Sequence, residues 1–219
     1  FDLTFTGIIK TMPTLTHAAA PQSDPRIIRS KAAIQQALLN QIAIGRDFES
    51  LTVSEIAERA GLTRKTFYAR FGSLGQVVES VIIELFSDIA SRVDDTMLRI
   101  PMTNNSGSML VFRAYEAQRE ILAPLIRHCP TALFIKPVGF VVSNLLRRTI
   151  AINDLQPMNE ADEAYLVAVI ASTVHGVLSV WVERGFSESP EQVAVFLDNL
   201  LVDGLQKLLT SHGESSLRN

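Results

Sequence analysis

Residues 51–73 carry the feature that most restricts the fold: two short helical patterns separated by a very tight turn. The first opens with Thr52 and Glu55 in capping-box spacing, in which the Thr side chain accepts a hydrogen bond from the third helical N–H. It ends at Gly61, a residue type that readily adopts the left-handed conformation found after helix C-termini. The second begins at Thr63 and runs through Phe71. Two short helices joined in this way predict a helix-turn-helix.

Helical spacing recurs from residue 25 to the end, and no alternating strand pattern persists, so the chain is predicted to be all-α. Ser23 and Asp24 are cap candidates for the first helix, and Ser73 with Gln76 forms a second capping box. The expected helices cover residues 25–45, 52–60, 63–71, 73–98, 108–118, 120–129, 131–152, 161–185 and 190–210. We expect a disordered or vector-derived leader at 1–23, a DNA-binding domain at 24–72 and a helical bundle for effector binding and dimerisation at 73–219.

The charge is divided unequally between these parts. Residues 24–72 carry a net charge of +3 and residues 73–219 a net charge of −6. This asymmetry is expected if only the first part meets a polyanion. The single cysteine, Cys129, cannot form an internal disulfide and fits the reduced cytoplasm.

The longest uncharged segment lies late in the chain. The 19 residues between Glu163 and Glu183 have no formal charge, which is close to membrane-spanning length. However, Ser172, Thr173 and His175 lie near its centre, and neither flank has the basic cluster that orients a spanning helix. We therefore expect no membrane insertion but a helix buried on several sides, in a bundle or a subunit interface.

The second short helix has the two faces that a recognition helix needs. Phe67 and Phe71 are four residues apart and share an inward face, whereas polar residues occupy the exposed side. Arg64 can donate two hydrogen bonds to a guanine edge, and Lys65 can reach a base or a phosphate. The alternatives are that Tyr68 only packs and that Arg64 and Lys65 form an ordinary solvated face. The expected DNA-binding residues are Thr52, Ser54, Thr63, Arg64, Lys65, Thr66, Tyr68 and Arg70.

The run LTVSEIAERAGLTRKTFYARFGS, residues 51–73, resembles the DNA-binding region of the TetR family of transcriptional regulators. The resemblance rests on the Thr52 cap, the Ala-x-x-Ala-Gly pattern ending at Gly61, the pair Phe67-Tyr68, and Phe71 before the next helix. It covers about residues 26–98 strongly and the remainder only in helix order and in the Trp-x-Glu-x-Gly pattern at 181–185. It implies base contacts from the residues at 64–66, a backbone contact from Tyr68, a C-terminal dimer interface and an effector pocket.

One position departs from the family pattern. Many members have a phosphate-binding Lys at the start of the fourth helix, where this chain has Leu74. A missing contact would make DNA binding comparatively tolerant of salt. The alternative is that Leu74 packs against Phe71 or Val78.

The last two expected helices fit a dimer bundle, because apolar residues are concentrated on them. The expected interface residues are Leu166, Ile170, Val174, Leu178, Trp181, Val193, Phe196, Leu197, Leu200 and Leu201. Two-fold symmetry would give a pseudo-palindromic double-stranded operator. A repressor is the expected role.

The middle helices are expected to enclose a small, largely apolar effector of unidentified structure. The expected pocket residues are Phe112, Arg113, Tyr115, His128, Phe134, Phe140 and His175, with Met109, Leu125, Val141 and Leu145 as further lining. For each histidine, a hydrogen-bonded core role is the competing interpretation.

Motifs for catalysis are missing from the sequence. It has no metal-binding pair of the His-x-x-x-His or Cys-x-x-Cys type, no Gly-rich phosphate loop and no Gly-x-Ser-x-Gly elbow. We expect no enzyme, no catalytic residue, no metal and no cofactor. The remaining alternative is a DNA-bound adaptor or structural protein of the same fold without an effector.

Overall fold

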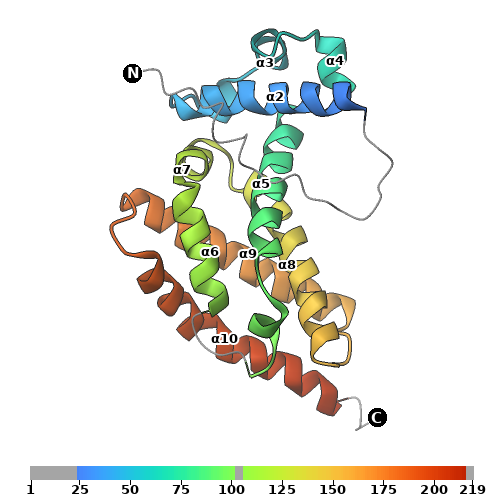
Figure 1. Ribbon diagram of the computed structural model, residues 1–219, viewed down its shortest axis with the longest axis vertical. Helices are drawn as coiled ribbons and strands as arrows, with labels where there is room; N and C mark the ends of the chain where they lie inside the picture. Colours follow the sequence, from blue (N-terminus) through green and yellow to red (C-terminus); the bar gives the residue numbers. More distant parts are fainter. Residues whose placement is uncertain (1–23, 102–105, 216–219) are drawn as a thin grey trace.

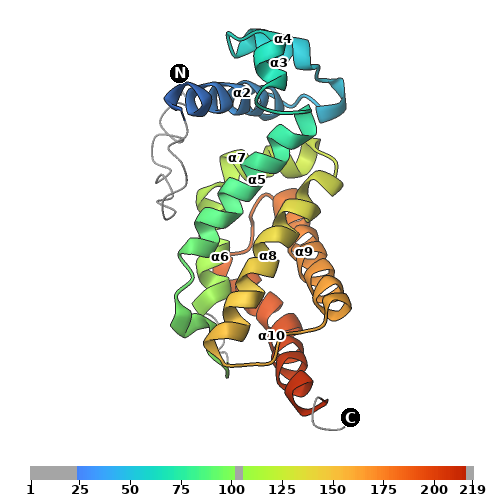
Figure 2. The ribbon, with the colours of Figure 1, turned by 90° about the vertical axis from the view of Figure 1, so that its right-hand side faces the viewer.

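The computed structural model describes residues 24–101 and 106–215, and every regular element within these ranges is helical (Figures 1 and 2). The all-α prediction is confirmed. The elements are α2 (Pro25–Ala43), η1 (Phe48–Ser50), α3 (Val53–Arg59), α4 (Arg64–Tyr68), α5 (Leu74–Ser91), η2 (Asp95–Leu98), α6 (Ser106–Ala117), α7 (Arg119–His128), α8 (Ala132–Ile152), α9 (Glu160–Glu183) and α10 (Pro190–Ser215). The expected leader at 1–23 lies outside the described residues.

Side-chain caps begin the helices where the sequence predicts them. The carboxylate of Asp24 accepts a hydrogen bond from the N–H of Arg26 at 2.8 Å and begins α2. Ser73 Oγ accepts from the N–H of Gln76 at 3.2 Å, and Gln76 Oε1 accepts from the N–H of Gly72 at 2.7 Å. These bonds satisfy N–H groups that have no partner inside the first turn of a helix.

The expectation of one helix over residues 73–98 is wrong. Helix α5 ends at Ser91, and the short helix η2 follows at Asp95–Leu98. The break has a local cause, because the Asp94 side chain accepts a hydrogen bond from the N–H of Thr96 at 2.8 Å and starts a new turn. The apolar periodicity continues across this break, so the sequence pattern alone does not reveal it.

The helices form a longer body and one end that carries the expected DNA-binding domain, which consists of α2, α3 and α4 and is called the DNA-binding end below (Figure 1). Helices α3 and α4 lie at the end of the molecule opposite the C-terminus, and α2 crosses beneath them. Helix α5 starts at this end and runs into the body, where it packs along α8. Helix α8 also packs on α9, whereas α10 packs on α6. The body therefore has two helix pairs, α8 with α9 and α6 with α10, and α5 connects it to the DNA-binding end.

Candidate nucleic-acid interface and effector cavity

The helix-turn-helix is fixed by a buried core and a tight turn. Phe67 and Ile56 are fully buried, and the ring of Phe71 lies 6.3 Å from that of Phe67. Gly61 has a positive φ of 67°, which an L side chain rarely adopts. The N–H of Gly61 donates to the Glu58 carbonyl, and the N–H of Leu62 donates to the Ala57 carbonyl, each at 2.9 Å. This geometry sets the angle at which α4 leaves α3.

The solvent-facing side of α4 carries the predicted recognition residues. Thr63 caps the helix, accepting a hydrogen bond from the N–H of Thr66 at 3.1 Å. Arg64 and Lys65 are exposed, and within the described part of the chain neither side chain forms a hydrogen bond or an ion pair. Tyr68 is 51% exposed. Thr52 and Ser54 are also exposed, at the start of α3. These side chains are available to an external partner.

Two further predicted DNA-binding residues, Thr66 and Arg70, are less exposed and form side-chain hydrogen bonds within the chain. The hydroxyl of Thr66 lies 3.0 Å from that of Thr63, and the residue is half-buried. Arg70 Nε donates to Oγ of Ser30, a residue of α2, at 2.7 Å. Arg70 therefore links the residues just after α4 to α2. The sequence alone does not reveal this role, because the two partners are forty positions apart.

Two of the basic residues in this part of the chain form ion pairs with an acidic neighbour. Glu55 forms an ion pair with Arg46 and a second with Arg59, the latter at 3.2 Å. The hydrogen bond from Arg46, together with the Arg59 guanidinium, holds the pKa of Glu55 below its ordinary value. Arg64 and Lys65 therefore stand out as the cations of α4 that remain open to a polyanion.

Leu74 belongs to the core of the DNA-binding end. Its side chain is 8% exposed at the first position of α5. It lies in the same apolar cluster as Leu51, Phe71 and Val78. The structure thus favours the interpretation that Leu74 packs in the core, and not the interpretation that Leu74 is an exposed position at which a phosphate-binding Lys has been lost.

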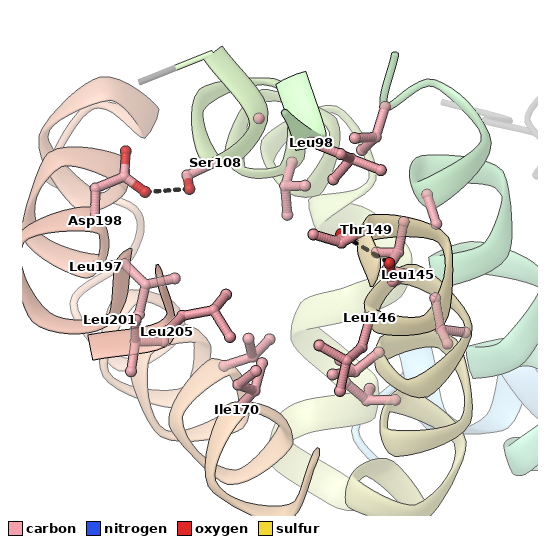
Figure 3. A pocket seen from close by; sticks show the side chains of 18 of the residues that line it. Leu98, Ser108, Leu145, Leu146, Thr149, Ile170, Leu197, Asp198, Leu201 and Leu205 are labelled. Atoms are coloured by element: carbon pink, nitrogen blue, oxygen red, sulfur yellow. Dashed lines mark hydrogen bonds between the residues drawn. The ribbon is translucent and has the colours of Figure 1, made fainter. Parts of the chain in front are cut away.

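The body contains an apolar cavity of about 450 Å³ (Figure 3). Its walls come from α5, α6, α8, α9 and α10, with side chains such as Phe86, Leu145, Ile170 and Leu201. The polar groups among its lining residues are the side chains of Tyr115, Ser108, Thr149 and Asp198. Asp198 and Ser108 are joined by a hydrogen bond between α10 and α6, and Thr149 lies across the cavity on α8.

The structure brings only some of the predicted pocket residues to this cavity. Phe112 and Tyr115 line it, as do Val141 and Leu145. Met109 and Leu125 are not among its lining residues. Neither are Arg113, His128, Phe134, Phe140 and His175.

The residues outside the cavity have other surroundings. Arg113 Nε donates to Glu191 at 2.7 Å, and His128 Nδ1 lies 3.0 Å from an oxygen of Asp47. Phe140 is 58% exposed.

The rings of Phe134 and His175 meet edge to face with centroids 5.0 Å apart, and burial lowers the pKa of His175. His175 is half-buried and packs on Phe134 outside the lining of the cavity.

The residues expected at the dimer interface divide into three groups. Leu178, Trp181, Val193 and Leu197 are buried within the subunit, with exposures of 0, 2, 8 and 8%. Leu166, Ile170, Val174 and Leu201 line the cavity, as does Leu197. Phe196 and Leu200 are 61% and 58% exposed, and Leu200 also lines the cavity. We therefore revise the expected interface, because side chains buried in their own subunit cannot contact a partner without rearrangement.

Trp181 shows why the first group is internal. Its ring centroid lies 5.7 Å from that of Phe112 and 4.9 Å from that of Phe186, and its indole N–H donates to the Glu188 carbonyl at 3.0 Å. The indole is thus satisfied within the subunit as a core anchor.

Helix α9 leaves apolar surface uncovered. In the described chain it is the one helix whose length and composition alone would permit a membrane span, yet only 28% of its most apolar window is buried. Tyr165, Val169 and Val180 are 74, 54 and 55% exposed. Their spacing places them along one side of the helix.

Acidic, cysteine and histidine side chains do not gather into a metal site. Within residues 24–101 and 106–215, no group of three or more of them could hold a metal ion.

Comparisons with known proteins agree with this architecture. A profile described as bacterial regulatory proteins of the tetR family matches residues 40–81, and one described as a transcriptional regulator C-terminal region matches residues 106–203. The HTH-type transcriptional regulator YxbF of Bacillus subtilis is 23% identical over 177 residues, covering 79% of this chain and 44% of the relative. The chain thus spans less than half the length of that curated relative.

Two solved structures share the fold. The dihydroxyacetone kinase operon activator DhaS matches with 16% identity and a TM-score of 0.50, covering 83% of this chain and 98% of that one. The repressor AlkX from Dietzia sp. strain DQ12-45-1b matches with 21% identity and a TM-score of 0.51, with the same coverage. The family profiles, the relative and the fold together assign the chain to the TetR family of transcriptional regulators.

Proposed function

We propose that this protein is a cytoplasmic transcriptional repressor that binds a pseudo-palindromic operator as a homodimer and is released by a small, largely apolar effector. The observation that carries the proposal is the position of α5, which directly follows the helix-turn-helix of α3 and α4 and also lines the cavity. One continuous helix thereby links the two candidate sites.

The DNA contact is assigned to the exposed side of α4. Arg64 is placed to read a base edge, because a guanidinium can donate two hydrogen bonds to guanine. Lys65 and Tyr68 supply a base or phosphate contact and a backbone contact, respectively. Thr52 and Ser54 are assigned to phosphates from the start of α3.

The dimer is assigned to the uncovered sides of α9 and α10. Tyr165, Val169 and Val180 on α9, with Phe196 and Leu200 on α10, leave apolar surface in water. Val169 and Leu200 also line the cavity. TetR-family regulators act as dimers, so a second copy of this chain is the occupant we propose. Two copies related by a two-fold axis would present two recognition helices to inverted half-sites.

Effector control follows from the shared helix. Phe86, Ile89 and Ala90 of α5 line the cavity, whereas Leu74 and Val78, nearer the start of the same helix, are buried in the continuous apolar cluster that also contains Ile56 and Phe67 of the helix-turn-helix. A ligand shifts an equilibrium only when it binds one arrangement better than the other. An effector that tilts α5 would change the spacing of the two recognition helices and release the operator.

Repression, as opposed to activation, is part of what we propose. The two structural neighbours named above are called an activator and a repressor, so the shared fold accommodates both roles.

Selection of bound fragments from genomic DNA, followed by footprinting, tests the DNA-binding part. We expect protection of two inverted half-sites with centres about 34–36 Å apart, or a multiple of that spacing. Protection without sequence preference would contradict the proposal.

Titration of the bound complex with dodecan-1-ol tests effector release. Leu145→Trp, which fills the cavity from α8, is the matched control. We expect release of DNA from the native protein and not from the variant. Retention of DNA by the native protein while the alcohol occupies the cavity would favour the adaptor without an effector.

A further inference from the structure

The described residues that line the cavity include three with a hydroxyl group: Ser108, Tyr115 and Thr149. Two of these hydroxyls donate their hydrogen within the chain. Ser108 Oγ donates to Asp198 Oδ1, and Thr149 Oγ1 donates to the Leu145 carbonyl at 2.9 Å (Figure 3). The Tyr115 hydroxyl differs from them, because it has no hydrogen-bond partner in the part of the chain that the structure describes.

Tyr115 is held in one place within the body. It is 3% exposed, and the rings of Phe86 and Phe112 have their centroids 5.1 and 5.6 Å from its own. Burial raises the pKa of its phenol, so the group stays protonated and keeps a hydrogen to donate. A buried O–H group without an acceptor costs free energy, because it has lost its hydrogen bond to water. A ligand that supplies an acceptor would recover this cost.

The Tyr115 oxygen is within reach of the cavity. Among the described residues, no side-chain nitrogen or oxygen is both fully enclosed and without a partner. Since the Tyr115 oxygen has no partner, it keeps a small open surface, and the space that Tyr115 borders is the cavity. An acceptor atom that lies against α6 inside the cavity can therefore receive a hydrogen bond from this hydroxyl.

The remaining lining selects against an anionic acceptor. No Lys, Arg or His is among the described lining residues, and most of these residues are aliphatic or aromatic. A carboxylate would leave water here without gaining a cation, at a high cost in free energy. The carbonyl of a ketone or an ester accepts the same hydrogen bond and loses much less hydration.

We propose that the effector is an uncharged ketone or ester whose carbonyl oxygen accepts a hydrogen bond from the Tyr115 hydroxyl, while its apolar chain fills the remainder of the 450 Å³ cavity. This inference rests on the proposed effector function. It specifies the chemical class of the ligand and the residue that selects it.

Three probes of similar length test the inference: decan-2-one, 2-methyldec-1-ene and decanoate, each titrated into the full chain without DNA and below its solubility limit. The alkene has the shape of the ketone, with a methylene group in place of the carbonyl oxygen. Trp181 packs on the cavity residue Phe112 and reports binding by fluorescence. We expect the ketone to bind about tenfold more tightly than the alkene, because it alone satisfies the hydroxyl. Decanoate should bind about tenfold or more weakly than the ketone.

Two variants that each remove one hydroxyl from the lining locate the contact. Tyr115→Phe should lower the affinity for decan-2-one about tenfold and leave that for the alkene unchanged. Thr149→Val, the matched control on α8, should keep the preference for the ketone. In the ligand-free protein, Tyr115→Phe should not lower the Tm, because it breaks no hydrogen bond within the described chain.

Several results would overturn the inference. Equal affinities of the native protein for the ketone and the alkene, or no binding by any probe, would remove the carbonyl from recognition. An unchanged affinity for the ketone in Tyr115→Phe, or a clear fall in the Tm of that variant, would contradict the role of Tyr115. Decanoate binding as tightly as the ketone would contradict an uncharged ligand.

The outcome is separable from the proposed function, because binding is measured without DNA. A preference for the ketone combined with no release of DNA would contradict effector control and leave the ligand class standing.

Discussion

Leu74→Lys is the substitution that separates a packing role from a DNA-contact role at the start of α5. The native side chain is 8% exposed, so nearly all of its apolar surface is removed from water. Exposing a buried Leu costs about 1.5–3 kcal/mol, and a cation in the first turn of a helix costs a further 0.3–1 kcal/mol or so. We therefore expect the free energy of unfolding to fall by about 2–4 kcal/mol. For a protein of this size, this lowers the Tm by about 4–16 °C.

Two measurements on the same preparations decide between the roles. Calorimetry gives the Tm, and fluorescence anisotropy on a random duplex over a range of KCl concentrations gives the salt slope of binding. We expect a lower Tm with an unchanged slope, whereas the volume-conserving control Leu74→Met should change the Tm little. A new phosphate contact would instead steepen the slope by about 0.9 per subunit, or about 2 per dimer. A steeper slope with an unchanged Tm would refute the packing argument.

Four further substitutions test the base contact of Arg64, the hydrogen bond between Arg70 and Ser30, and the dimer interface. Arg64→Ala should weaken operator binding by about 1–3 kcal/mol and relax the preference at one base position per half-site; uniform weakening on all sequences would assign Arg64 to phosphate. Arg70→Ala and Ser30→Ala should each lower the Tm without changing the salt slope, because they break the same 2.7 Å hydrogen bond; a slope that is shallower by about 0.9 per subunit in Arg70→Ala alone would show a phosphate contact. Phe196→Asp should give monomers in sedimentation, whereas Ile44→Asp should not, since Ile44 is an even more exposed apolar residue but lies on the DNA-binding end; dimers in both would place the interface elsewhere.

Features encoded by neighbouring residues could be predicted from the sequence. Thr52, Thr63 and Ser73 each cap a helix within three positions of their hydrogen-bond partners. Gly61 has the positive φ that its place in the pattern requires. The inward face of Phe67 and Phe71 follows from their four-residue spacing. The helix-turn-helix was therefore predictable from local chemistry.

Features that depend on packing across the body could not be predicted in the same way. Periodicity shows that Ile170, Phe196 and Leu201 are apolar, but it does not show whether a core, a cavity or a partner covers them. The structure puts Ile170 and Leu201 at the cavity and leaves Phe196 in water. Likewise, the polar partner of Arg70 lies on a helix distant in sequence. Asp198 was missed as a cavity residue because an acid on a long apolar helix ordinarily marks its solvated side.

The central claim is that occupancy of the cavity sets the spacing of the two recognition helices through α5. Spin labels at Ala69→Cys, beside α4, report this spacing in a Cys129→Ala background. Burial raises the pKa of Cys129 to about 12, so its removal eliminates only a poorly reactive thiol.

The decisive measurement is the distance distribution between the two labels in the dimer, recorded on the operator and after addition of dodecan-1-ol. We expect one narrow distribution on DNA and a shift of its mean as the alcohol releases the duplex, with no shift when Leu145→Trp fills the cavity. Release of DNA with an unchanged distance distribution would contradict it.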